Sequence, residues 1–260
     1  MKIILSPAKS IQEKVRVSGI ESSFSVYLNE AGEIHEKIKK LSAAQLEKLM
    51  DISTDLAVLN HDRFQKWSIA LHKKNGKPAG YLFTGAAYQG LDFTTLNKKD
   101  QEKAQQHLRI LSGMYGVLKP LDLILPYRLE MGTSLSISAK QKNLYQFWGD
   151  KIRIYLEKDL SEEKHPLLVN LASAEYFKAA QLDKIKYPVV TCSFKDRTKA
   201  GDYRMNMTFA KQARGMMTRF IIQHDIKKAG DLRAFDSKGY YFDPTSSNKT
   251  EFVFLRDKAL

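Results

Sequence analysis

The sequence has a single cysteine, Cys192, among its 260 residues. One cysteine cannot form an intramolecular disulfide, so the fold must be stable without covalent cross-links. Cys192 lies in an apolar run, 188–194, of the kind found in buried strands. We therefore expect an inert thiol; a redox-sensing thiol is the alternative.

Long apolar runs are missing too. The apolar residues in MKIILSPAKS are too few for a signal peptide, and Pro7 and Lys9 interrupt them. No stretch has the apolar length needed to cross a bilayer. We expect a soluble, cytoplasmic protein that has no membrane partner.

Several catalytic signatures are also absent. The chain has no P-loop, no GxGxxG, no HExxH and no CxxC. Its six histidines are scattered without helical spacing, which argues against a histidine-based metal site. The sequence therefore predicts no cofactor and no metal, although a site made of carboxylates alone is left open.

Positive charge is what the sequence has in excess. Forty-two Lys and Arg residues against 29 Asp and Glu give a formal net charge of +13. Such an excess favours nucleic acid or phosphorylated ligands as partners, with solubility as the plainer explanation. The hydrophobic and charged fractions, 43% and 27%, are those of a globular protein. Without repeats or a linker, we expect one compact α/β domain over 1–260, a mixed sheet wrapped by helices.

Two predicted strands are followed by polar residues. The strand at 2–5 precedes Ser6-Pro-Ala-Lys9, and the strand at 167–171 precedes a helix that Ser173 could cap. Ligands of α/β proteins often lie at such strand ends, so Lys9 is predicted to contact a phosphate or a substrate. Ser6 in its SxxK spacing is a less favoured nucleophile, because the companion motifs of SxxK enzymes are missing.

Periodicity predicts helices elsewhere. Residues 29–67 are helical in pattern, and 97–111 form an amphipathic helix on which Arg109 points away from the apolar face. A further helix, 210–224, follows two strands at 187–195 and 203–209. Residues 195–233 contain ten basic and four acidic side chains, the best candidate for a surface that binds a polyanion.

The stretch 107–132 has the densest set of signals. A helix end leads into a glycine turn, Gly113-Met-Tyr-Gly116, like the hairpin of helix-hairpin-helix units whose amides hold a phosphate. The usual hairpin has its glycines two apart, whereas these are three apart; a helix end that leads into a buried strand explains Gly113 equally well. Residues 126–132 then alternate as a half-buried strand does, so Arg128 and Glu130 would share a side and could pair.

Together these stretches resemble the YaaA family of bacterial peroxide stress resistance proteins. The resemblance spans nearly the whole chain in order. It is carried by SPAK at 6–9, QHLRILSGMYGVLKPLD at 106–122, PYRLEMG at 126–132, LYQFWGD at 144–150, NLASAEYFK at 170–178, AKQAR at 210–214 and RFII at 219–222. The resemblance implies a cytoplasmic protein that limits damage from hydrogen peroxide and reactive intracellular iron. It also implies one α/β domain with a basic cleft, and DNA binding through a helix-hairpin-helix-like element. It brings no established catalytic residues.

The first of two hypotheses is DNA binding by a monomer with little sequence preference. Amides around Gly113 and Gly116 would add phosphate contacts, and Tyr115 or Trp148 would stack on a base. The cations expected to neutralise phosphates are Lys9, Arg109, Arg128, Lys211, Arg214 and Arg219.

The second hypothesis is an enzyme that acts on a nucleic-acid or phosphorylated substrate in a basic pocket. Glu130, Glu175 and Tyr176 are its catalytic candidates, with a carboxylate as general base. Ser6, Lys9 and Arg128 would then lie in the same pocket. Direct iron sequestration by carboxylates is a third option.

Overall fold

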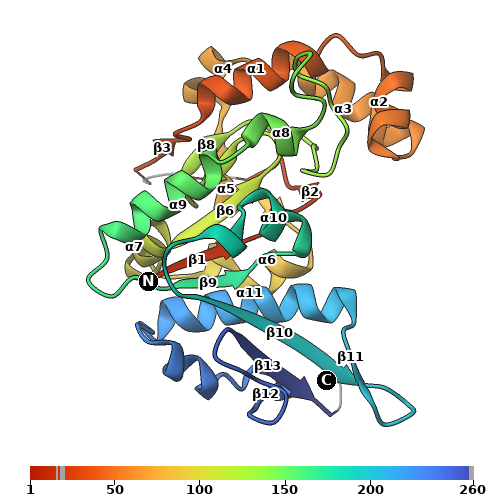
Figure 1. The fold of residues 1–260 in the computed structure, drawn as a ribbon. Helices are drawn as coiled ribbons and strands as arrows, with labels where there is room; N and C mark the ends of the chain where they lie inside the picture. The colour runs from red at the N-terminus through yellow and green to blue at the C-terminus, as the bar shows by residue number, and fades with distance from the viewer. Residues whose placement is uncertain (16, 18–20, 258–260) are drawn as a thin grey trace.

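The computed structural model describes residues 1–15, 17 and 21–257, and its centre is a mixed eight-stranded sheet (Figure 1). The strands in spatial order are β12 (Tyr241–Asp243), β13 (Glu251–Arg256), β10 (Val189–Arg197), β9 (Leu168–Leu171), β1 (Lys2–Leu5), β6 (Leu108–Ser112) and β7 (Gly116–Leu118), with β11 (Tyr203–Arg204) beside β10. The five central strands, from β13 to β6, run parallel. The strands β7, β11 and β12 are antiparallel to their neighbours.

The helices cover both faces of the sheet. In Figure 1, α9 and α10 lie over the face toward the viewer, whereas α11 lies behind β10 and packs on α6 and β1. Their bounds are α1 (Leu28–Ile38), α2 (Ala43–Met50), α3 (Thr54–Lys66), α4 (Ile69–Asn75), α5 (Ala79–Leu82), α6 (Ala86–Leu91), α7 (Lys98–His107), α8 (Leu144–Trp148), α9 (Lys151–Ser161), α10 (Ala174–Ala179) and α11 (Met207–Gln223). Because helices cover both sides, β1, β6 and β9 are buried along their whole length, as interior strands of parallel sheets are. The expected α/β fold is confirmed.

Short elements complete the chain. The two-stranded sheet pairs β2 (Ser10–Ile11) with β5 (Phe83–Thr84), and β8 (Asp122–Ile124) joins β3 (Ser23–Phe24) to β4 (Lys77–Pro78). The 3₁₀ turns are Phe93–Thr95, Leu182–Lys184, Ala229–Ala234 and Ser237–Gly239. Within the described part of the chain, no helix combines the length and the apolar character needed to span a membrane.

The order of the strands creates a crevice between β1 and β9. The chain leaves β1 toward β6 on one side, and it leaves β9 toward β10 on the other side. Adjacent parallel strands whose connections depart in opposite directions form a topological switch point, where α/β proteins bind ligands beyond the carboxyl ends. Ser6 and Ala172 are the first residues beyond these two strands.

Several predicted elements have different bounds. The helix expected over 97–111 ends at His107, because Leu108–Ser112 is the fully buried strand β6. A break at Gly149, whose φ is +52°, separates α8 from α9. The expected strand 203–209 stops at Arg204, since Asn206 caps α11 by accepting hydrogen bonds from the backbone N–H groups of Thr208 and Phe209. The alternating segment 126–132 belongs to no strand.

Residues 108–118 do not form the expected helix-hairpin-helix-like element. Residues 108–118 form an antiparallel β-hairpin, with Ile110 opposite Leu118. The turn amides of Met114 and Tyr115 donate to Ser112 Oγ rather than remaining available to a phosphate. A Cβ atom at Gly113 would lie 2.6 Å from Leu129 O, and one at Gly116 would lie 2.6 Å from the Trp148 ring. Close packing therefore explains both glycines.

Tyr115 belongs to a buried polar network and cannot stack on a base. Its hydroxyl accepts hydrogen bonds from Trp67 Nε1 at 2.9 Å and from the Leu125 amide at 3.2 Å. It can then donate to His72 Nε2 at 3.0 Å, provided that His72 Nδ1 carries the proton that faces Ser68 O at 2.8 Å. Trp148 is equally buried and donates to Gly113 O. The prediction that either ring stacks on DNA is wrong, because neither is exposed.

Candidate functional site

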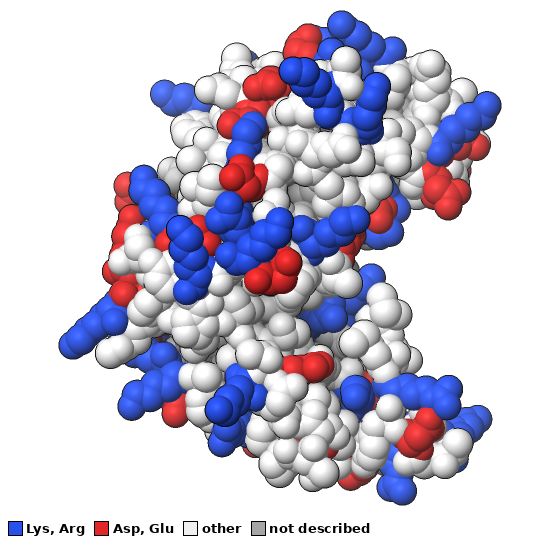
Figure 2. Space-filling view, in the orientation of Figure 1, with Lys and Arg blue, Asp and Glu red and all other residues white. Residues whose placement is uncertain are grey.

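A cavity of about 310 Å³ lies at the carboxyl ends of β1 and β9. We call it the switch-point pocket; residues from five segments line it, within 5–10, 84–88, 127–130, 171–176 and 208–214. Figure 2 shows the surface hollowed at the right of the molecule, where α10 faces the amino-terminal end of α11. Segments distant in the sequence thus meet where the strand order predicts a ligand.

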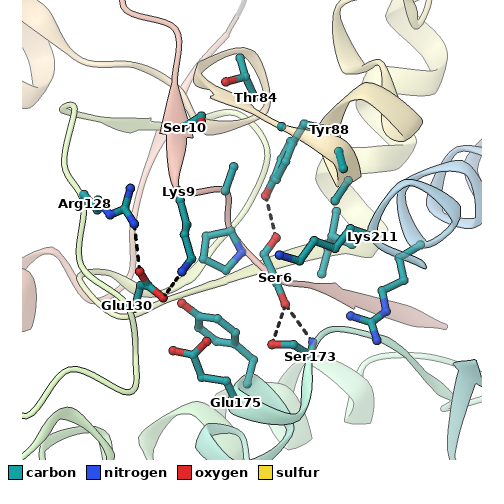
Figure 3. A pocket seen from close by; sticks show the side chains of 18 of the residues that line it. Ser6, Lys9, Ser10, Thr84, Tyr88, Arg128, Glu130, Ser173, Glu175 and Lys211 are labelled. Carbon is teal, nitrogen blue, oxygen red and sulfur yellow. Dashed lines mark hydrogen bonds and ion pairs between the residues drawn. The ribbon is translucent and has the colours of Figure 1, made fainter. Parts of the chain in front are cut away.

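Two serines join the strand ends at the base of the pocket (Figure 3). Ser6 Oγ accepts a hydrogen bond from the Ser173 amide at 2.9 Å and lies 3.3 Å from Ser173 Oγ. Tyr88 donates to Ser6 O at 3.1 Å. Among the described residues no base bonds to Ser6 Oγ, so nothing activates it as a nucleophile. Its contacts instead fix the loop after β1 against the loop after β9.

Glu130 lies between two cations on one wall. Its Oε2 is 2.6 Å from Lys9 Nζ, and its Oε1 is 3.3 Å from Arg128 Nη2. The predicted pairing of Arg128 with Glu130 is confirmed, although no strand carries it. Residues 127, 129 and 131 are buried and hold the intervening side chains toward the pocket. This wall therefore has one positive charge more than it has negative charge.

The opposite wall is cationic and has no carboxylate. Lys211 and Arg214 lie one turn apart on α11, so they share a helix face. Within the described chain, the ion pairs of the pocket are those of Glu130 alone. Arg214 Nε is buried and has no hydrogen-bond partner among the described residues, and burial lowers the pKa of this guanidinium from its ordinary value. An unpaired buried donor is unfavourable, so this wall favours an anionic ligand.

Two glycines set the position of this wall. A Cβ atom at Gly215 would lie 1.7 Å from Ala87 O, and one at Gly90 would lie 2.1 Å from Gln212 O. Helices α6 and α11 therefore touch through their backbones. That contact holds Lys211 and Arg214 beside the start of α6, which also lines the pocket.

Glu175 and Tyr176 complete the site from α10. Glu175 Oε1 accepts a hydrogen bond from the Gly132 amide at 2.8 Å. Tyr176 is 3% exposed, and its pKa is raised well above the ordinary value, first by burial and then by the charge of Glu175. Burial raises the pKa of Tyr88 in the same way. Both phenols therefore hold their protons at neutral pH, and Tyr88 donates its proton to Ser6 O.

The structure brings together seven of the predicted site residues and separates five. Those that line the pocket are Lys9, Arg128, Glu130, Glu175, Tyr176, Lys211 and Arg214. Gly113, Tyr115 and Gly116 lie in the buried hairpin. Arg109 is 1% exposed and pairs with Asp159 at 2.7 Å, so its prediction as a phosphate contact is wrong. Arg219 lies outside the lining and donates to the carbonyl oxygens of Leu91 and Asp92.

Sequence reasoning missed several lining residues. Ser173 occupies the N-cap position of α10 as expected, but its side chain makes no capping bond and contacts Ser6 instead. Tyr88 lies in the glycine-flanked segment 85–90, which gave no sign of a buried phenol. Thr84 and Thr208 carry no local signal, since only the tertiary fold brings them to the cavity.

The remaining candidate chemistries find little support. Cys192 is buried in β10, and burial raises the pKa of its thiol to about 12, so the reactive thiolate is scarce. These properties argue against Cys192 as a redox-sensing thiol. Within the described residues, no three His, Cys, Asp or Glu side chains are grouped so that they could hold a metal ion.

Comparison with known proteins gives consistent matches. The family profile described as "Peroxide stress protein YaaA" matches residues 1–246. Curated proteins of similar sequence include a UPF0246 protein of Hahella chejuensis, 41% identical over 257 residues, or 99% of this chain and 100% of that protein. A UPF0246 protein of Aliivibrio fischeri is 42% identical over 99% of both chains. One from Idiomarina loihiensis is 44% identical over 98% of both.

Proposed function

This chain belongs to the YaaA family of peroxide stress proteins, and we propose from that premise that it is a cytoplasmic DNA-binding protein. Its binding to DNA would limit the damage done by hydrogen peroxide and intracellular iron. The proposal extends the family's role in peroxide stress to a molecular partner and to a place on the molecule where that partner binds.

One observation supports the proposal above the others. Lys9, Arg128, Lys211 and Arg214 come from three separate parts of the chain and line the same pocket, and Lys211 and Arg214 have no carboxylate partner among the described residues. Cations collected in a concave site raise the local potential and attract a polyanion. The excess of basic side chains over the whole molecule would add attraction at longer range.

A salt titration tests the binding. A short labelled DNA duplex should bind at low salt, and its affinity should fall steeply between about 50 and about 200 mM salt. Replacing Lys211 and Arg214 together by Ala should reduce the log–log salt slope by about 1.8, since each lost phosphate contact removes about 0.9.

The matched control is Lys73→Ala with Lys74→Ala. These two exposed cations also lie on a helix, but outside the pocket. The control removes the same charge and should leave the slope nearly unchanged. Equal losses in both double variants would show that general charge, and not the pocket, binds DNA.

The link to iron needs a cellular measurement. Cells that lack this protein should survive hydrogen peroxide poorly, and the intact chain should restore survival. The Lys211→Ala and Arg214→Ala double variant should fail to restore it at equal abundance. Chelatable iron, measured in the same cells, should rise where survival is lost; full rescue by the variant would exclude the pocket from this role.

Catalysis in the same pocket is a second candidate. The observation that favours it is the presence of Glu130, Glu175 and the protonated phenol of Tyr176 among the lining residues. Carboxylates and a phenol can serve as general base and acid. Glu130→Gln and Glu175→Gln should abolish turnover of a nucleic-acid substrate if the protein is an enzyme. A pure binder should bind DNA equally well or more tightly after either change, because repulsion of the phosphates is removed.

A further inference from the structure

The switch-point pocket is too small to take in a DNA duplex. Its volume of about 310 Å³ lies at the lower end of the range for small-molecule sites, about 300 to 1,000 Å³. The major groove of a duplex alone is about 12 Å wide, so paired DNA must remain at the rim. Only a single unpaired unit of the strand fits inside.

One side of the pocket suits a phosphate. Thr208, Lys211 and Arg214 follow one another at three-residue spacing on α11 and so lie on one face. Figure 3 shows Lys211 extending from the helix toward Ser6 at the base. Arg214 Nε, buried and without a partner among the described residues, is a donor that a phosphate oxygen would satisfy.

The rest of the pocket suits a base and a sugar. Tyr88, Tyr127, Tyr176 and Leu129 are among the lining residues, and at 3 to 5% exposure each contributes a small apolar area to the wall. A nucleobase taken out of its stack is held by apolar and aromatic contacts on its faces and by hydrogen bonds at its edge.

Polar groups for those edge bonds are present. Ser6 Oγ accepts from the Ser173 amide and can donate to Ser173 Oγ, which leaves the hydroxyl proton of Ser173 available to a ligand. Glu175 uses Oε1 to accept from Gly132, and Oε2 has no hydrogen-bond partner among the described residues. The pocket therefore offers both a donor and an acceptor apart from its cations.

From these features we infer that the pocket binds one nucleoside monophosphate unit of DNA, with its phosphate between Lys211 and Arg214. The unit is an unpaired nucleotide, from a strand end or turned out of the duplex. The inference rests on the proposed DNA binding and specifies which part of the DNA enters the protein.

Calorimetric titration of the full chain tests it. The probes are dAMP, dGMP, dCMP and dTMP, each compared with its deoxynucleoside and with inorganic phosphate. At least one monophosphate should bind about tenfold or more tighter than either of its halves, because the two ends are held at once. The Lys211→Ala and Arg214→Ala double variant should lose about tenfold or more for that monophosphate, since charge-assisted bonds to phosphate are strong. The Lys73→Ala and Lys74→Ala control should lose nothing.

Three results distinguish this inference from the proposed function. If inorganic phosphate binds as tightly as every monophosphate, the pocket is a simple anion site and the inference is overturned. If no monophosphate binds a protein that still binds duplex DNA, the inference fails while DNA binding stands. If a monophosphate binds but DNA does not, the pocket assignment is supported and DNA binding is refuted.

A second comparison identifies the source of the nucleotide. Linear duplexes with an overhang are compared with closed circles that contain an unpaired nucleotide. Tighter binding of the linear duplexes would show that a strand end enters the pocket. Tighter binding of the circles would show that a nucleotide turned out of the duplex enters it. A fully paired closed circle that competes as well as both would overturn the inference.

Discussion

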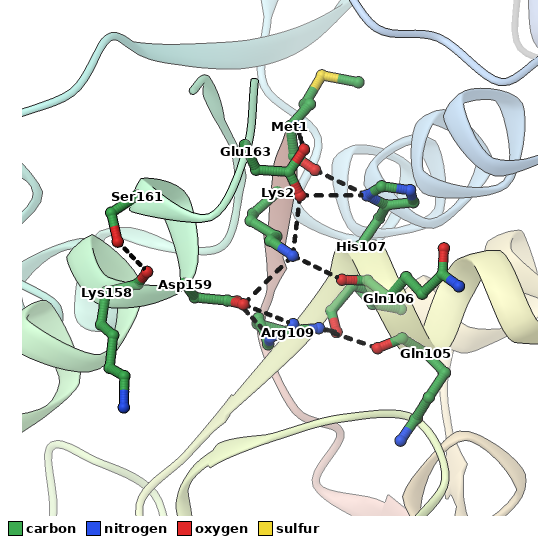
Figure 4. A network of polar contacts seen from close by, with 11 residues as sticks. Met1, Lys2, Gln105, Gln106, His107, Arg109, Lys158, Asp159, Ser161 and Glu163 are labelled. Atoms are coloured by element: carbon green, nitrogen blue, oxygen red, sulfur yellow. Dashed lines mark hydrogen bonds and ion pairs between the residues drawn. The ribbon is translucent and has the colours of Figure 1, made fainter. Parts of the chain in front are cut away.

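Charged side chains cluster at both ends of strand β1, but the two clusters differ in how many of their cations have a carboxylate partner. At the amino end, Lys2 Nζ lies 3.2 Å from Asp159 and 2.9 Å from Glu163, and Arg109 donates to the same Asp159 (Figure 4). At the carboxyl end, Lys211 and Arg214 lack a carboxylate partner within the described chain. The strand between the two ends is four residues long.

The difference separates structural cations from candidate functional ones. At the amino end each buried cation has a carboxylate, and Lys2 and Arg109 also donate to the carbonyl oxygens of Gln106 and Gln105. Such pairing satisfies the charges internally and leaves nothing for a ligand. At the carboxyl end Lys9 and Arg128 share the single carboxylate of Glu130, and Lys211 and Arg214 are left for an external anion. A shortage of carboxylates, rather than how basic the neighbourhood is, therefore marks the candidate functional end.

Of the changes considered, Asp159→Asn should lower the free energy of unfolding most, and it tests the ion-pair network at the amino end of β1. The change leaves Arg109 and Lys2 short of negative charge in a buried place, and breaking a buried pair costs about 3 to 5 kcal/mol. Urea unfolding should show this loss, while DNA affinity of the folded protein stays unchanged. Asp150→Asn is the control, because Asp150 pairs with Arg153 at the surface and such pairs contribute about 0 to 1 kcal/mol. Similar losses from both changes would mean that the network is not structural.

Gly215→Ala should come next and tests the carboxyl end. The added Cβ atom would collide with Ala87 O, and overpacking of this kind costs about 1 to 3 kcal/mol. Helix α11 must then move from α6 and carry Lys211 and Arg214 with it, so DNA affinity should fall as well. Gly230→Ala is the control, since a Cβ atom there meets nothing within 4 Å. Unchanged affinity in Gly215→Ala would show that the pocket tolerates movement of this wall.

The local pattern of the sequence predicted part of the pocket lining, but it did not predict the ion-pair network at the amino end of β1. The sequence places Lys9 in the pocket because Lys9 follows the short apolar strand β1. It places Glu175 there because Glu175 lies at the start of the helix that follows the apolar strand β9. Arg109 was misplaced because residues 108–111 continue the apolar spacing of α7, and spacing alone cannot distinguish a helix end from a buried strand. Its partner Asp159 lies 50 residues away, a distance over which no local rule operates.

Arg219 shows a second limit of local reasoning. It lies eight residues after Lys211 on α11, so the two share a face by periodicity. Eight residues also advance about 12 Å along the helix axis, which takes Arg219 past the pocket to the carbonyl oxygens of Leu91 and Asp92. Periodicity predicts the direction of a side chain, but the extent of a pocket along the helix comes from the fold.

Arg214→Met should change binding without lowering stability. An unpaired guanidinium gains little from its burial, so an apolar side chain of similar length should leave the free energy of unfolding unchanged or raise it by up to about 1 kcal/mol. Affinity for DNA should fall, because a phosphate contact is lost. The pair of measurements sharpens the contrast with Asp159→Asn, which affects stability alone. A clear loss of stability in Arg214→Met would place this arginine among the structural cations.

The smallest expected effect is a pH dependence at the amino end, where His107 lies beside the network. Its Nδ1 is 2.9 Å from Met1 O, and its pKa is lowered, chiefly by burial, despite the nearby Glu163. A histidine with a lowered pKa in the folded state takes up its proton more readily when unfolded, so stability should fall as the pH drops below about 6.5. Burial also lowers the pKa of His35 and of His72, so both add to the loss of stability at low pH. Between pH 7.5 and pH 5.5, the melting temperature should therefore fall less in His107→Gln than in the unmodified chain. An equal fall in both would exclude His107 from the trend. The pKa of Glu163 is lowered in the folded state, so the stability that its charge contributes is lost only below the ordinary value of 4.5.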